Sequence, residues 1–202
     1  MKKTCIVLAI TLLTMGLLFA SPSWVGVQGI ASVKQETGTE EHTIIPIGLN
    51  IAGTIYLGEE LPVGIGFQGG FTKTALHKRD GAEMEAKDYP LTWNIGATGK
   101  FRLNMSDLLA LELGAGLMYE RYARTGDILG SDYVINFDTL SALVVSDLVI
   151  NLSDTLAIVG GVDLAFPLTA KGKYSIGSIS NTVDYDVKGY TLTGKLGIAL
   201  GF

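Results

Sequence analysis

Apolar residues alternate with polar residues or glycine along most of the chain after residue 23. Successive side chains of a β-strand point to opposite faces, so a period of two predicts strands. Two segments place large apolar residues on the polar face as well, at Trp24 and Ile30 in the first and at Leu143 and Val145 in the sixth. The alternation covers eight segments: 25–33, 45–57, 63–71, 91–103, 109–119, 140–150, 156–168 and 190–202.

The connections between these segments alternate in length. Short links lie near 58–62, 104–107 and 151–154, and longer ones lie near 35–43, 77–88, 124–136 and 170–187. A meander with short turns at one end and longer loops at the other is the layout of outer-membrane barrels. The pattern predicts an all-β fold for residues 21–202: an eight-stranded antiparallel up-and-down transmembrane β-barrel. The short turns and both chain ends would face the periplasm, and the loops would face outward.

The two faces differ in kind, which bears on whether the barrel lies in a membrane. A soluble lipocalin-like barrel would line its interior with apolar side chains and carry its charges outside. Here the apolar set is aliphatic with aromatic residues near its ends, as in the girdles of membrane barrels. The outer girdle is expected at Phe71, Tyr89, Trp93, Tyr119, Phe166 and Tyr190, and the periplasmic one at Phe101 and Phe202.

Charged residues on the other face are expected to point into the lumen. The link at 104–107 predicts that Leu103 pairs with Leu109, which sets Lys100 directly opposite Glu112 and favours an ion pair. Asp163 and Lys195 lie at similar depth on the last two strands. Eight strands enclose little more than their own side chains, so these charges are interpreted as structural rather than as a conduction path. The expected lumen charges are Lys100, Arg102, Glu112, Asp147, Asp163 and Lys195.

Residues 1–20 have the pattern of a cleaved signal peptide. Lys2 and Lys3 precede an apolar run that is short for a membrane-spanning helix, and small residues follow it. Cleavage is expected after Ala20 or as late as Ser23. An uncleaved signal anchor is the alternative, but no positive cluster follows the run.

Composition and charge exclude several classes of protein. Hydrophobic residues make up 48% of the chain and charged residues 17%, yet no long apolar run follows residue 20. The formal net charge of −5 differs from the clustered basic character of a nucleic-acid-binding protein. The only cysteine, Cys5, lies in the predicted signal peptide, so the mature chain would have no disulfide and no cysteine-based metal site. No cofactor is expected.

The last residues carry a motif of their own. Lys195, Gly197, Leu200 and Phe202 follow one another at the spacing of the C-terminal assembly signal of outer-membrane barrels, which this segment resembles. That resemblance implies recognition by the barrel-assembly machinery. The mature chain as a whole resembles the small-barrel families typified by OmpX, OmpW and the membrane domain of OmpA. The resemblance implies residence in the bacterial outer membrane, in contact with its lipid, and we expect a monomer.

Three functions are consistent with this fold. The first is a structural or surface-interaction barrel with a polar, side-chain-filled lumen, whose four outer loops contact host or cell-surface ligands. The alternative is a narrow channel or carrier for small or hydrophobic solutes, which the OmpW resemblance implies. An enzyme is not expected, because catalytic hydrolysis needs a nucleophile, a base and an orienting group in contact. The two histidines, His42 and His77, are interpreted as solvated loop residues, and neither is followed two positions later by serine as in the deacylase barrels.

Overall fold

The computed structural model describes residues 23–37, 40–57, 62–84, 89–128, 131–176 and 179–202. These residues form β-strands joined by turns, and no helix among them is long and apolar enough to cross a membrane. The strands are β1 (Trp24–Thr37), β2 (His42–Tyr56), β3 (Val63–Arg79), β4 (Ala82–Met84), β5 (Thr92–Asn104), β6 (Leu109–Ile128), β7 (Ser131–Asn151), β8 (Leu156–Ile176), β9 (Ile179–Tyr185) and β10 (Lys188–Gly201).

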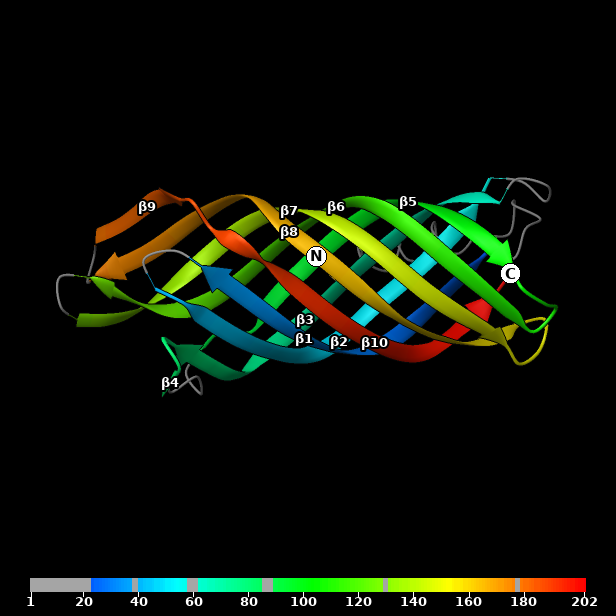
Figure 1. Cartoon of the computed structure of the whole chain (residues 1–202), viewed down its shortest axis with the longest axis horizontal. Coiled ribbons are helices and arrows are strands. Elements are labelled where there is room, and N and C mark those ends of the chain that lie inside the picture. The colour runs from blue at the N-terminus through cyan, green and yellow to red at the C-terminus, as the bar shows by residue number, and fades with distance from the viewer. Residues whose placement is uncertain (1–22, 38–39, 58–61, 85–88, 129–130, 177–178) are drawn as a thin grey trace, which may run out of the picture.

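Eight of these strands close into an antiparallel barrel (Figure 1). Each barrel strand pairs with the next one along the chain, and β10 closes the sheet by pairing with both β8 and β1. The short strands β4 and β9 stand outside this cycle as extensions at the outer end. The predicted fold class, an eight-stranded up-and-down barrel, is therefore confirmed.

The outer surface of the barrel is apolar around its circumference. Leu49 on β2, Ile95 on β5 and Leu196 on β10 are 63%, 59% and 65% exposed, and the other barrel strands contribute side chains of the same kind. On β6 this outward face runs from Leu109 to Tyr119, close to the roughly 9–11 residues that a tilted strand needs to cross a bilayer. The inward residues that alternate with them are mostly buried polar groups and glycine.

The short turns that precede β6 and β8 are built in the same way, and their sequences repeat the pattern Asn-x-Ser-Asp at 104–107 and 151–154. In the β6 turn, Ser106 Oγ accepts from the Leu109 N–H at 3.1 Å, and in the β8 turn Ser153 Oγ accepts from the Leu156 N–H at 3.1 Å. In both turns the last paired residues of the two strands are six positions apart in the sequence, Asn104 with Ala110 and Asn151 with Ala157. A serine hydroxyl that bonds nearby backbone stabilises such tight turns, so the repeat encodes turn chemistry.

The predicted outer loops are wrong in one respect, because the strands continue well beyond the apolar band. β6 and β7 stay paired as far as Ile128 with Ser131, and β8 continues to Ile176 before β9 turns back along it. We call the outer parts of β6, β7 and β8, together with β9, the outer sheet; they project beyond the barrel at the left of Figure 1. Where its side chains are described, the inner face of this sheet carries the apolar residues Tyr122, Ile135, Phe137 and Ala170, which pack together and support strands where loops were expected.

The link predicted at 77–88 also contains strand. β3 continues to Arg79 and turns into β4 through Asp80 and Gly81, with φ angles of 50° and 81°. A two-residue hairpin with positive φ at both positions is the type I′ turn that Asp-Gly favours.

Candidate functional site

All six predicted lumen charges are buried, each less than a tenth exposed. They lie in the half of the barrel nearest the short turns and come from five strands, β5, β6, β7, β8 and β10. We refer to these six side chains as the charge plug. Three are cations and three are anions, so the set is neutral overall, which is the arrangement that makes buried charges tolerable.

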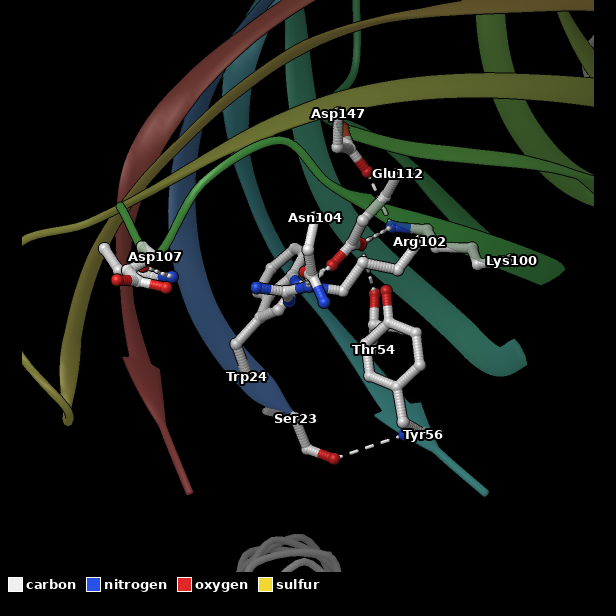
Figure 2. Close-up of polar contacts among 11 residues, drawn as sticks. Ser23, Trp24, Thr54, Tyr56, Lys100, Arg102, Asn104, Asp107, Glu112 and Asp147 are labelled. Atoms are coloured by element: carbon white, nitrogen blue, oxygen red, sulfur yellow. Dashed lines mark hydrogen bonds and ion pairs between the residues drawn. The ribbon is translucent and has the colours of Figure 1, made fainter. Parts of the chain in front are cut away.

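Glu112 lies at the centre of one half of the plug and is fully buried (Figure 2). Its Oε1 accepts hydrogen bonds from Trp24 Nε1 at 2.9 Å and from the Arg102 guanidinium at 3.2 Å. Its Oε2 accepts from Thr54 Oγ1 at 3.0 Å and from Lys100 Nζ at 3.2 Å. One carboxylate thus joins four strands of the wall.

The second half of the plug continues from Lys100. Lys100 Nζ lies 2.6 Å from Asp147 Oδ2, and Lys195 Nζ lies 2.8 Å from Asp147 Oδ1. Lys195 also lies 2.5 Å from Asp163 Oδ1, so the two residues that the sequence placed at similar depth are in contact. Anions and cations alternate along this line of contacts, which crosses the lumen from β5 to β10.

The register predicted for the hairpin joining β5 to β6 is wrong by two residues. Leu103 pairs with Leu111 rather than Leu109, and Arg102 rather than Lys100 lies directly opposite Glu112. The turn closes one residue later along the chain than predicted, between Ser106 and Leu109. A shift of two leaves every side chain on its predicted face, so Lys100 still reaches Glu112 from the diagonal position.

Every strand of the barrel contributes to this arrangement. Trp24 comes from β1 and Thr54 from β2, and β3 contributes Gly66, where a Cβ atom would lie 2.7 Å from Lys100 Cε. The glycine therefore leaves the volume that the lysine stem fills. At this position the space beside the glycine is therefore filled by a side chain and is not open to water.

Two cavities lie on opposite sides of the plug. The larger, about 590 Å³, is at the short-turn end and is lined by Trp24 and Arg102 together with turn residues. The smaller, about 20 Å³, lies on the other side among Asn50, Glu120 and Asp163. The smaller has room for about one water molecule.

The sequence missed a second ion pair further outward. Lys34 and Glu120 are both buried and form a salt bridge, and the Lys34 ammonium lies over the Tyr122 ring at 3.6 Å from its centroid. Both residues lie just outside predicted strand segments, Lys34 after 25–33 and Glu120 after 109–119. The sequence could have predicted the inward position of Lys34, since it lies at an even position like the inward residues Gln28 and Ser32.

Three sequence interpretations at the outer end are wrong. His42 and His77 are buried, 2% and 0% exposed, instead of solvated. Tyr89 is 4% exposed and bonds to His77, so it does not belong to the outer girdle. Phe71, Phe166 and other girdle residues do face outward, and Phe71 is 61% exposed. The cause is that β2 and β3 continue beyond their predicted ends, which brings both histidines onto the inner face.

A charged cluster lies on the outer surface just beyond the apolar band. Asp138 accepts hydrogen bonds from Arg121 Nε at 2.6 Å and from Lys173 Nζ at 2.5 Å. Partial burial alone would raise the pKa of Asp138, but the hydrogen bonds from these two cations outweigh it and hold that pKa at about 2. Arg121 also lies over the Trp93 ring, 5.8 Å from its centroid.

The residues of the predicted assembly signal lie on β10 and immediately after it. Lys195 belongs to the plug, and Leu200 is 59% exposed on the outer surface. Gly197 lies where β10 contacts β1, since a Cβ atom there would be 2.0 Å from the Val27 carbonyl oxygen. The Phe202 N–H donates to the Ser23 carbonyl at 3.0 Å and extends the closing seam. The predicted signal peptide lies outside the described residues.

Nothing in the described part of the chain gathers three His, Cys, Asp or Glu side chains in a metal-binding arrangement. The six plug charges bond to one another and to neighbouring residues. Chemically, then, the plug is an internal cross-link of the barrel wall.

A closed eight-stranded barrel with an apolar outside and charges inside has the fold of the small outer-membrane β-barrels. Among solved structures, the chain is similar to Neisserial surface protein A, with a TM-score of 0.59 at 14% identity over 89% of this chain and 97% of that one. It is also similar to OprG from Pseudomonas aeruginosa, with a TM-score of 0.58 at 10% identity, covering 91% and 97%.

A major outer membrane protein from Thermus thermophilus gives a TM-score of 0.53 at 14% identity, covering 88% of this chain and 99% of that one. No family model and no curated protein sequence matches the chain. At these identities the likeness extends to the fold and to nothing finer.

Proposed function

We propose that the chain is a monomeric bacterial outer-membrane barrel with a closed lumen, which acts by binding other molecules at its outer end and has no catalytic role. The observation that carries the proposal is the charge plug. It is neutral and buried, and it is connected through Trp24, Thr54 and Gly66 to the strands that do not supply a charge.

The plug favours a closed barrel over the channel alternative. A solute passing the lumen would have to separate Lys100 from Asp147 or Lys195 from Asp163, and these pairs are 2.6 and 2.5 Å apart. Separating one partner from a buried ion pair costs about 3–5 kcal/mol. Each of the two cavities reaches the plug at one member, Arg102 in the larger and Asp163 in the smaller, and we infer that no continuous water path joins them.

Conductance across a planar bilayer tests the closed lumen. The refolded wild-type protein should give no discrete current steps, whereas Lys100→Ala combined with Glu112→Ala removes two central members and should give steps. Lys73→Ala is the matched control, because Lys73 is an exposed residue on β3 and its removal leaves the plug intact. Wild-type steps that change size with Lys100→Ala would instead establish the channel function.

The outer sheet is the part of the barrel best suited to binding. The outermost pair between β5 and β6 is Trp93 with Arg121. Farther outward, β6 pairs only with β7 in the described structure. β9 pairs with β8 along Ile179–Tyr185 and with no other described strand. Unpaired strand edges carry free N–H and C=O groups that take up an extended segment of another protein. We therefore propose extended polypeptide at the outer end as the ligand.

Peptide capture tests this binding mode. A random-peptide phage library selected on the protein in lipid nanodiscs should yield enriched peptides. Successive N–H groups of β9 point alternately to β8 and to the free edge. Of the neighbouring variants Asn181→Pro and Thr182→Pro, one therefore removes a donor at the free edge and leaves the hydrogen bonds to β8 intact. That variant should lose the peptides, while Thr182→Ala keeps them. Absence of enrichment, or capture unaffected by either proline, would refute edge pairing.

The last residues are proposed to direct assembly by the barrel-insertion machinery. The support is the position of Leu200 on the exposed surface of the closing strand, where a partner could reach it before closure. Deletion of Phe202 should lower the amount of folded protein in the outer membrane. It should leave refolding of the purified chain into vesicles nearly unchanged, and an equal loss in both would indicate a structural role only.

A further inference from the structure

A line of buried hydrogen bonds crosses the outer ends of β2 and β3. His42 Nδ1 and His77 Nε2 are 2.9 Å apart, and their rings stack with centroids 5.2 Å apart. The other nitrogen of His77, Nδ1, lies 2.6 Å from Tyr89 Oη. The other nitrogen of His42, Nε2, lies 3.3 Å from Glu40 Oε2. We call these four residues the histidine latch.

One placement of protons satisfies all three contacts with both imidazoles neutral. Tyr89 O–H donates to His77 Nδ1, His77 Nε2–H donates to His42 Nδ1, and His42 Nε2–H donates to Glu40. A neutral imidazole has one donor and one acceptor nitrogen, whereas a protonated one has two donors. A first added proton is accommodated on His77 if Tyr89 becomes the acceptor. A second proton leaves two N–H groups facing each other across 2.9 Å.

Other charged groups surround the pair. On β1, Glu36 lies opposite His42 in the β1–β2 register, and on β3 Arg79 lies opposite it from the other side. Glu40 precedes β2 and Tyr89 precedes β5. The carboxylates favour the first proton, but they do not remove the clash between two donors, because that clash arises from the direct contact of the rings.

An irregularity in the β2–β3 pairing allows the outer rungs, the paired residues from His42 with Arg79 to Ile45 with Leu76, to separate locally. The β2–β3 register shifts between Ile45 and Pro46, where Ile45 pairs with Leu76 but Pro46 pairs with Thr74. Ala75 is therefore an extra residue on β3, and Pro46 has no N–H to donate. A bulge interrupts the ladder, so the rungs from His42 to Ile45 are joined weakly to the continuous ladder below.

We propose that the histidine latch is an acid-sensitive contact that holds the outer ends of β2 and β3 together at neutral pH and releases them when both imidazoles are protonated. The open form takes up the second proton with the ordinary affinity of histidine, and the closed form does not. Falling pH therefore shifts the equilibrium toward the open form, and rising pH restores the closed one.

The size of the shift follows from the proton affinity. A free histidine takes up its proton near pH 6.5, so one extra proton held only by the open form favours that form by up to about 30-fold at pH 5 relative to pH 8, and tighter binding of the first proton in the closed form lowers this factor. The protection of amides in the outer rungs against hydrogen exchange should fall by a similar factor. Amides below the bulge, such as the rung Ile51 with Gly69, should keep their protection.

Nuclear magnetic resonance of the full mature barrel in lipid nanodiscs measures both effects. In the wild type, the two histidine ring signals should titrate in two steps separated by more than about one pH unit. The N–H groups of Thr43 and Ile44 point to opposite neighbours, β1 and β3, and the protection factor of the one that faces β3, corrected for intrinsic exchange, should fall with the second step. A single shared step, or outer rungs that respond no more than Ile51, would overturn the proposal without any variant.

Two variants separate the latch from a general effect of acid. His42→Gln keeps a polar side chain of similar reach but cannot be charged, so His77 should titrate in one step and the outer rungs should lose their pH response. Tyr89→Phe keeps the histidine pair and should retain the second step and the release. An acid response equal in His42→Gln and wild type would also refute the latch. Heat-modifiable gel mobility confirms in each case that the barrel has folded.

Discussion

Replacing Glu112 by glutamine tests the plug with the smallest change of shape. The carboxylate is fully buried and accepts four hydrogen bonds, two of them from the cations Lys100 and Arg102. Glutamine has nearly the same volume, but one of its two terminal groups is a donor. That group must face either the Lys100 ammonium or the Arg102 guanidinium, which are donors as well. The six-residue plug changes from neutral to a net charge of about +1 in the absence of proton release.

The expected cost follows from these contacts. Loss of one partner from a buried ion pair typically destabilises a protein by about 3–5 kcal/mol. The amide oxygen retains part of the bonding of Oε1 to Trp24, which offsets some of this loss. We expect Glu112→Gln to lower the free energy of unfolding by about 3 kcal/mol. The measurement is reversible urea unfolding in phospholipid vesicles, followed by tryptophan fluorescence and by gel mobility.

A double-mutant cycle separates lost pairing from lost packing. Adding Lys100→Met to Glu112→Gln restores a neutral plug, so the double variant should be more stable than the sum of the single losses by about 2 kcal/mol. Glu83→Gln is the matched control, since Glu83 is exposed on β4, and it should change stability by less than about 0.5 kcal/mol. A loss below about 1 kcal/mol for Glu112→Gln, or simple additivity in the cycle, would show that the charges are not coupled as described.

Two further predictions concern the wall and the outer surface. Gly116→Ala should cost about 1–3 kcal/mol in the same unfolding assay, because its Cβ would lie 2.0 Å from the Ala97 carbonyl oxygen. Gly99→Ala, with nothing within 4 Å of its Cβ, should be tolerated, and equal effects would refute this interpretation of close strand contact. Asp138 has a folded pKa of about 2, below its usual value, so its contribution to stability is present above about pH 4 and is lost as pH falls toward 2. Asp138→Asn should destabilise at pH 7 by about 1 kcal/mol, allowing for screening of its half-exposed partners, and a gap to wild type that persists at pH 2 would contradict this assignment.

The barrel itself was predictable because its information is local. Alternation assigns each side chain to a face, and Lys100, Glu112 and Lys195 have the parity that the structure shows. Pairing register depends on where each turn closes, and the sequence does not distinguish closure at Ser106 from closure one residue earlier. The error of two residues changed the partner of Lys100 but not its face. A register error of two residues therefore leaves the predicted face of each side chain correct, whereas the predicted residue pairs become wrong.

The two histidines show the limit of the same reasoning. His42 has the parity of the inward residues Asn50 and Thr54, so extending β2 outward would have found it. His77 has the opposite parity to the inward residues Thr72 and Thr74 and reaches the inner face only because the bulge adds one residue. Alternation contains no sign of a bulge. Charged neighbours at Lys78 and Arg79 further suggested a solvated segment.

The two ends of the lumen are filled by different chemistry, and this bears on how the outer sheet binds. Beyond the ion pairs lies an apolar cluster in which the Phe137 ring contacts the rings of Tyr122 and Tyr185, and Ile44 is packed in the same cluster. This cluster joins β2 to the described inner face of the outer sheet and packs the strands where they leave the barrel. A strand edge held in place by such packing is ordered before a ligand arrives, so binding does not have to order it. The closed plug and the outer sheet thus rest on separate sets of side chains. Substitutions in the plug should therefore alter stability and conductance while leaving peptide capture at the outer end intact.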